Sequence, residues 1–150
     1  MTPIEGYFVI PPDELHWRPS ALMKIPQADV LRRTRSDLLA ARFWRLPPKS
    51  ANALQKRHRA EELFVVLEGT GRIRVDGRTL TVPRYGSVLV GPRLLRQIFN
   101  DRDEEVLWLV VGAPEAELRG GEAFDSTLIY PVNPRQLPAE LGGVAWPPPD

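Results

Sequence analysis

Alternating polar and apolar positions dominate the middle of the chain. Residues 72–75 and 78–82 both alternate, which is the two-residue period of a β-strand with one face in water. The dipeptide Asp76-Gly77 separates the two runs, and both residue types tolerate the positive φ values of a tight hairpin turn. The segment is therefore predicted to form a β-hairpin.

Further apolar runs on both sides of this hairpin have strand-like length and end at turn residues. They are residues 41–46, 62–67, 87–90, 96–99 and 105–111. The last run is nearly all apolar, so we expect both of its faces to be covered. The pattern also predicts strands at 6–10 and 127–130, and one short helix or turn between 28 and 39. Many short strands at this spacing are typical of an all-β sandwich or barrel.

The length of 150 residues favours one domain with a core that needs no disulfide. The chain has no cysteine, which excludes disulfides and thiolate metal sites. Many of its 16 prolines lie near the two ends, and proline lacks an amide proton and fixes φ, so the ends should be extended arms. We expect a single domain over 1–150, with a barrel at about 41–112 and arms at 1–40 and 113–150 packing on it.

Charge and hydropathy limit the classes of partner. The chain has 20 Lys and Arg against 19 Asp and Glu, and a net charge of +1 gives no electrostatic signature of nucleic-acid binding. No apolar run approaches the ~18 residues of a membrane helix, and the first 15 residues lack the basic start of a signal peptide. We therefore expect a cytoplasmic protein with no nucleic-acid and no membrane partner.

Two segments, residues 58–71 and 96–100, carry polar residues and glycines at motif-like spacings. The first runs HRAEELFVVLEGTG from His58, and resembles the cupin pattern in which His-x-His precedes a Glu and, after six more residues, a Gly. Glu62 and Gly69 have that spacing. The second, RQIFN at 96–100, resembles His-x-x-x-Asn and ends in Asn100, which we expect to fix a turn. The resemblance implies a double-stranded β-helix (jelly-roll) barrel.

The metal ligands of the family are replaced at two positions. Cupins hold a metal with three His and one Glu, but Lys56 stands at the first His and Arg96 at the His of the second motif. Neither cation has a free lone pair to donate, and both repel a divalent ion. The remaining His58 and Glu62 are fewer than the ligands of a stable transition-metal site. We therefore predict a degenerate site without a metal cofactor.

The altered site favours an anion in place of the metal. Lys56 and Arg96 would supply positive charge inside the barrel, where a guanidinium fits a carboxylate or a phosphate, and Gln97 would add a further contact. His58 would donate, accept or move a proton, with Glu62 as the counter-ion of the cations. The sequence thus predicts that the barrel binds a small anionic ligand, with His58 and Glu62 as the candidate catalytic residues.

Two other functions stay open at this point. One is an enzyme of the oxygenase or sugar isomerase/epimerase type, with weak binding of a divalent transition metal by His58, Glu62 and a third ligand, Gln55 or Gln97. Without a metal, an epimerase needs only His58 as base and a proton donor such as Tyr85.

The other is a structural or interaction barrel without an active site, in which Glu62 forms a buried or half-buried ion pair with Arg96 or Lys56. The resemblance also implies a homodimer. The strand expected at 7–10 would then pair with the partner's sheet and cover an open edge.

Overall fold

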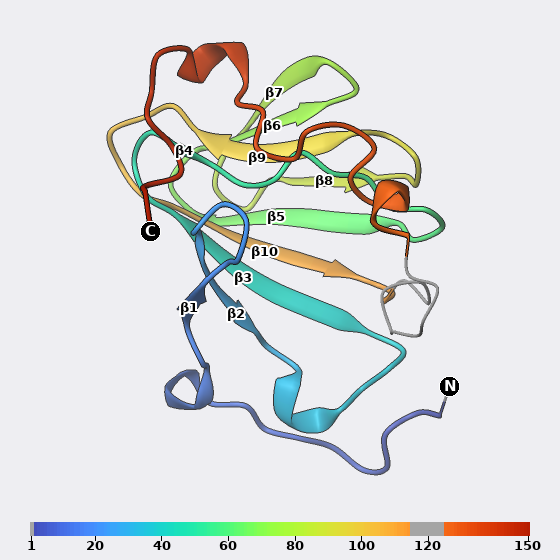
Figure 1. Cartoon of the computed structure of the whole chain (residues 1–150). Coiled ribbons are helices and arrows are strands. Elements are labelled where there is room, and N and C mark those ends of the chain that lie inside the picture. The colour runs from blue at the N-terminus through green and yellow to red at the C-terminus, as the bar shows by residue number, and fades with distance from the viewer. Residues whose placement is uncertain (1, 115–124) are drawn as a thin grey trace.

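A computed structural model describes residues 2–114 and 125–150 of the chain. These residues form two antiparallel β-sheets that lie face to face and are connected by loops and single 3-10 turns (Figure 1). Because the strands pair only in antiparallel registers and the inner faces enclose the core, the predicted all-β jelly-roll fold is confirmed.

The larger sheet has six strands. In spatial order they are β1 (Arg18–Pro19), β2 (Pro26–Asp29), β3 (Ala40–Leu46), β10 (Val106–Gly112), β5 (Glu62–Glu68) and β8 (Ser87–Val90). The smaller sheet contains β4 (Ser50–Ala51), β9 (Arg96–Asn100), β6 (Gly71–Val75) and β7 (Arg78–Val82). The 3-10 turns are η1 (Pro12–Glu14), η2 (Arg32–Thr34), η4 (Ser126–Leu128) and η5 (Ala139–Leu141).

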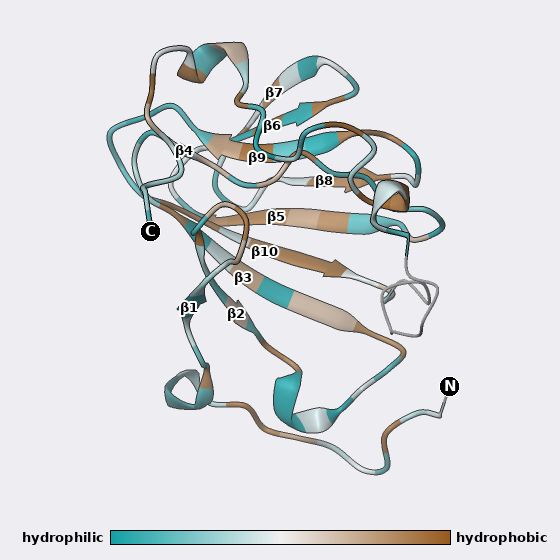
Figure 2. Cartoon of the chain, in the orientation of Figure 1, coloured by the Kyte–Doolittle hydropathy of each residue, from teal (hydrophilic) through white to brown (hydrophobic). Residues whose placement is uncertain are grey.

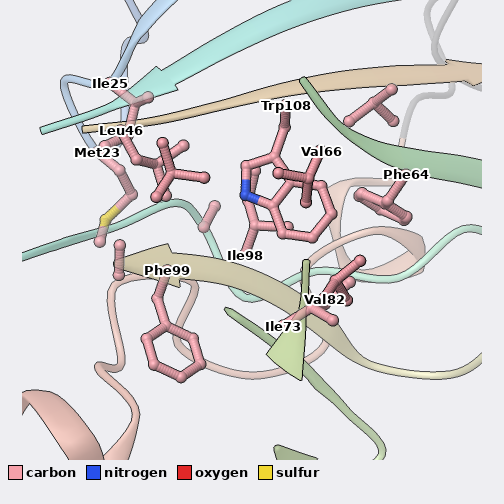
Figure 3. Close-up of a cluster of buried hydrophobic side chains, with 14 of the residues drawn as sticks. Met23, Ile25, Leu46, Phe64, Val66, Ile73, Val82, Ile98, Phe99 and Trp108 are labelled. Carbon is pink, nitrogen blue, oxygen red and sulfur yellow. The ribbon is translucent and has the colours of Figure 1, made fainter. Parts of the chain in front are cut away.

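The core lies between the sheets, where alternate residues of each strand point inward. Trp108 is fully buried and packs edge-to-face on Phe64, with ring centroids 6.2 Å apart. Figure 3 shows these rings facing Ile73 and Ile98 of the smaller sheet. Each such side chain stabilises the fold by about 1.5–3 kcal/mol when buried, so this layer is the main source of stability. The apolar strands β5 and β10 stand out in Figure 2.

The strands predicted within the barrel region are all present, within one or two residues at each end. The hairpin at Asp76-Gly77 is confirmed: Val75 pairs with Arg78, and both turn residues have positive φ, +49° and +80°. The short turn expected between 28 and 39 is the 3-10 turn η2.

Two strands predicted outside that region are wrong. Residues 6–10 form no strand, and Tyr7 is 86% exposed. The apolar run alone is not sufficient, because a strand also needs a neighbouring strand with which to form hydrogen bonds. Residues 127–130 lie in and after the 3-10 turn η4. The carboxylate of Asp125 accepts hydrogen bonds from the backbone N and the hydroxyl of Thr127, at 2.9 and 2.6 Å, which caps the turn and competes with strand pairing.

The two ends of the chain are more closely joined to the barrel than the predicted extended arms would be. Strand β2 pairs with β3 along Gln27↔Trp44, so part of the expected N-terminal arm is a strand of the larger sheet. At the other end, Leu54 N donates to Pro134 O at 2.9 Å. Residues 115–124 of the expected C-terminal arm lie outside the described residues, and the single domain and the homodimer stay predictions. Within the described ranges, no helix is long and apolar enough to cross a membrane.

Candidate functional site

A cavity of about 210 Å³ lies between the sheets, beside the apolar core. Its walls come from β2, β3, β5, β9, β10 and the segment 52–57 that follows β4. Among the described residues, the walls combine apolar side chains with five charged ones. The apolar wall includes Trp44, Phe64, Ile98 and Val110, and the charged residues are Asp29, Arg42, Arg57, Glu62 and Arg96.

The segment 52–57 forms part of the cavity wall and is joined to β9 by one isolated β-bridge. Gln55 and Arg96 form an antiparallel bridge, in which Gln55 N donates to Arg96 O at 3.1 Å and Arg96 N donates to Gln55 O at 2.7 Å. Residues directly opposite in such a pair share one face of the sheet. Gln55 and Arg57 accordingly line the cavity together with Arg96. Lys56 and His58, the residues expected from the motif, are not among the cavity residues.

A buried ion pair joins β5 to β9. Arg96 Nη1 donates to Glu62 Oε1 at 2.7 Å, and Arg96 is 1% exposed. The other guanidinium nitrogens donate to Leu94 O at 2.9 Å and to Gly91 O at 2.5 Å. The structure thus confirms the ion pair that the sequence suggested for Glu62. Because every nitrogen of this guanidinium is engaged, Arg96 holds the wall in place.

Arg57 lies next to this ion pair. Its Nη1 donates to Gln55 Oε1 at 2.8 Å, and its Nη2 is 3.5 Å from Glu62 Oε2. One carboxylate, that of Glu62, therefore stands between two guanidinium groups. Glu62 is thus shared between Arg96 and Arg57, and its single negative charge does not balance both cations.

A further cation, Arg42, comes from β3. It pairs in register with Val110 and lies on the inner face, two residues from Trp44. Its guanidinium stacks 5.8 Å from the ring of Trp44 and donates a short hydrogen bond to the side-chain oxygen of Gln27. Burial lowers the pKa of Arg42 from its ordinary value, Asp29 acts in the opposite direction, and neighbouring arginines lower it further. Among the described residues, the hydrogen-bond partner of this cation is a neutral amide.

The remaining predicted site residues have other positions. Gln97 borders the cavity, but its amide donates to Asn52 O at 3.0 Å and Gln136 O at 2.8 Å, and its oxygen accepts from Arg74 at 2.8 Å. The Gln97 side chain therefore fixes the C-terminal segment on the smaller sheet. Tyr85 is 70% exposed and accepts a hydrogen bond from its neighbour Arg84 at 2.7 Å.

The residues at this place do not fit a divalent metal. The oxygen of Gln55 accepts from Arg57, and the carboxylate of Glu62 is bound by Arg96. The guanidinium groups of Arg57 and Arg96 have no lone pair to donate to a metal ion. Within residues 2–114 and 125–150, no group of three or more His, Asp or Glu is placed to hold a metal ion. We derive no metal-dependent step for this site.

Sequence reasoning missed Arg42 and Arg57 as cavity residues. Arg42 could have been found from the alternation of β3, since Leu46 and Trp44 lie on the inner face at steps of two from it. Identifying Arg57 would have required the register of segment 52–57 against β9. That register depends on a long-range pairing that no local pattern contains.

Comparison with known proteins places the fold. Residues 42–112 match the model of the family described as cupin domain. A sugar phosphate isomerase from a cupin superfamily of Silicibacter pomeroyi is similar, with 17% identity, a TM-score of 0.63 and coverage of 71% of this chain and 75% of that chain. A search of curated proteins found no match.

Two further solved structures have similar scores. A predicted oxalate decarboxylase of Thermotoga maritima has 17% identity, a TM-score of 0.63 and coverage of 71% of this chain and 98% of that chain. A Cupin 2 conserved barrel domain protein from Salinispora arenicola has 15% identity, a TM-score of 0.62 and coverage of 75% and 92%. At these identities the similarity concerns the fold alone.

Proposed function

We propose that residues 42–112, which match the cupin domain model, form a barrel that binds a small organic anion without a metal. The observation that carries the proposal is the pair Arg42 and Arg57, which line one cavity with amides as their nearest bonded partners. The interior of the barrel therefore offers two positive side chains to a ligand.

The charges around the cavity support an anion over a neutral ligand. Three arginines and two carboxylates of the described residues line it, so this part of the lining carries one excess positive charge, three minus two. Glu62 neutralises Arg96, and Asp29 also accepts a backbone hydrogen bond from Leu31 at 3.1 Å. A bound carboxylate would supply the missing counter-charge through charge-assisted hydrogen bonds, which are stronger than those between neutral groups.

The two cations are held ready for such a ligand. Gln27 fixes the guanidinium of Arg42, and Gln55 fixes that of Arg57. A group that is already ordered loses less conformational entropy on binding, so this arrangement favours affinity. In this proposal Arg96 acts as a positioning residue, because its hydrogen bonds join β5, β9 and the preceding loop.

The candidate catalytic pair His58 and Glu62 has no catalytic role in this proposal. His58 is not among the residues that line the cavity, and the carboxylate of Glu62 is bound by Arg96. Lys56 likewise lies outside the lining, although its backbone N donates to Ile129 O at 2.9 Å and so tethers the C-terminal segment.

The proposal is tested by thermal unfolding with a panel of carboxylates, organic phosphates and the matching neutral amides. A carboxylate present at 100 times its dissociation constant should stabilise the fold by about 2.7 kcal/mol, while the matching amide should not. Arg42→Gln and Arg57→Gln should each remove most of that stabilisation. Arg45→Gln is the control, because Arg45 lies on β3 but is not among the cavity residues, and it pairs with Glu68. Unchanged stabilisation in both cavity variants would contradict the proposal.

A further inference from the structure

A second hollow of about 260 Å³ adjoins the cavity. The first cavity alone, at about 210 Å³, is smaller than the roughly 300–1,000 Å³ of ordinary ligand pockets. This favours a ligand that occupies both. The two hollows share six residues, Arg42, Trp44, Asn52, Ala53, Gln55 and Arg57.

The two hollows differ in their chemistry. The first has the carboxylates of Asp29 and Glu62 in its wall, whereas the described residues in the wall of the second include no acidic one. Apart from the shared arginines, the second hollow is bounded by neutral side chains, among which Leu22, Trp44 and Tyr130 pack against the core. A ligand can therefore place charge at the boundary between the hollows and an apolar body beyond it.

The outer wall of the second hollow is built by the two ends of the chain. The turn after Ser20 is closed by hydrogen bonds from Ile25 N to Ser20 Oγ at 3.0 Å and from Lys24 N to Ser20 O at 3.1 Å. On the other side, Tyr130 N donates to Ser126 O at 2.7 Å. Both walls lie outside residues 42–112, the part that matches the family model.

We propose that the second hollow is a specificity subsite, which accepts the aromatic or branched aliphatic body of a monocarboxylate bound by Arg42 and Arg57. The inference rests on the proposed function, since it takes the carboxylate position from there. A single negative charge balances the one excess positive charge of the first cavity, whereas a dianion such as a phosphate monoester would leave a charge uncompensated in a partly buried site. Trp44 and Tyr130 supply flat apolar surface for the body of the ligand.

Isothermal titration calorimetry, which measures the affinity of each of four probes, tests this inference. The probes are 3-phenylpropanoate, propanoate, succinate and 3-phenylpropan-1-ol, which vary the body and the charge separately. We expect 3-phenylpropanoate to bind at least about tenfold more tightly than propanoate or succinate, because only its ring reaches the second hollow. The alcohol should not bind measurably.

Two variants separate the inference from the function on which it rests. Tyr130→Ala should weaken 3-phenylpropanoate by about tenfold and leave propanoate unchanged, and Tyr130→Phe should retain binding and report on the fold. Arg57→Gln should weaken every carboxylate. Equal affinities for all three carboxylates, unaffected by Tyr130→Ala, would overturn the subsite but not anion binding. Binding that ignores Arg57→Gln, or no carboxylate binding at all, would overturn both.

Discussion

Gln55 lies directly opposite Arg96 in an antiparallel bridge, and this pairing decides which residues of the first motif face the cavity. Gln55 and Arg57 are inside, while Lys56 and His58 are absent from the lining. The cavity therefore contains amide and guanidinium groups in place of imidazoles. Successive side chains of an extended segment point to opposite faces. Because Gln55 and Arg57 face the cavity, His58, the single histidine of the motif, does not line it.

The ion pair between Glu62 and Arg96 should be the most sensitive polar contact of the barrel. Glu62→Leu would leave the guanidinium of Arg96 charged, 1% exposed and without this partner, at a cost of about 3–5 kcal/mol in the free energy of unfolding. The double variant Glu62→Leu/Arg96→Met should recover part of that loss, because it also removes the buried charge. Urea denaturation monitored by tryptophan fluorescence measures both.

Glu68→Leu is the matched control for this prediction. Glu68 lies on the same strand, and its side chain pairs with Arg45 at 3.1 Å but is 56% exposed. Exposed ion pairs contribute about 0–1 kcal/mol, so this variant should unfold at nearly the same urea concentration as the unmodified protein. Similar losses for Glu62→Leu and Glu68→Leu would show that burial does not set the cost.

Most of the fold could be predicted from the sequence because its signals are local. Strand alternation and the Asp76-Gly77 turn depend on neighbouring residues, and both were predicted correctly. The turn role of Asn100 also follows from its own side chain, which donates to Glu104 O at 2.6 Å and accepts from Arg102 N at 3.0 Å. The strand expected at 127–130 failed because one local capping contact outweighed an apolar run.

The site was predictable only in part, for a different physical reason. The motif spacing identified Glu62 and Arg96, and their ion pair is present. No local rule fixes how segment 55–58, which carries the two histidine positions of the first motif, is aligned with its partner strand. This register could therefore not be derived from the sequence. That register comes from backbone hydrogen bonds to β9, about forty residues away in the sequence. It places Arg57, and not Lys56, in the cavity wall.

Gly71 should be among the least replaceable residues of the core. A Cβ at this position would lie 2.4 Å from a ring carbon of Trp108 and 2.5 Å from a methyl of Val66, both of which are fully buried. Gly71→Ala should therefore cost about 1–3 kcal/mol or more through overpacking. Gly91→Ala is the control, since no described residue lies within 4 Å of the methyl group that alanine would add and the φ of Gly91 is not positive. It should change the melting temperature little. Equal melting temperatures for the two variants would contradict this packing.

Introducing histidines at the cavity positions should create a metal site. The variant Gln55→His/Arg57→His/Arg96→His adds three imidazoles to the carboxylate of Glu62, on residues that line one cavity. Three nitrogen ligands and one oxygen suit Zn²⁺ or Ni²⁺, which the present amide and guanidinium groups do not. We expect one equivalent of metal in isothermal titration and a higher melting temperature with metal, and neither effect in the unmodified protein.

A second variant, built on the motif spacing, tests the register itself. Lys56→His/Arg96→His, together with the natural His58, also yields three imidazoles and Glu62, and it loses the same ion pair to Arg96. Only one of its imidazoles, at position 96, replaces a residue that lines the cavity. It should therefore bind no stoichiometric metal, although circular dichroism should show the same β-sheet content as the first variant. If this variant bound metal more tightly than the first, the orientation of segment 55–58 in the barrel would be wrong, and Arg57 would lose its place in the proposed ligand site.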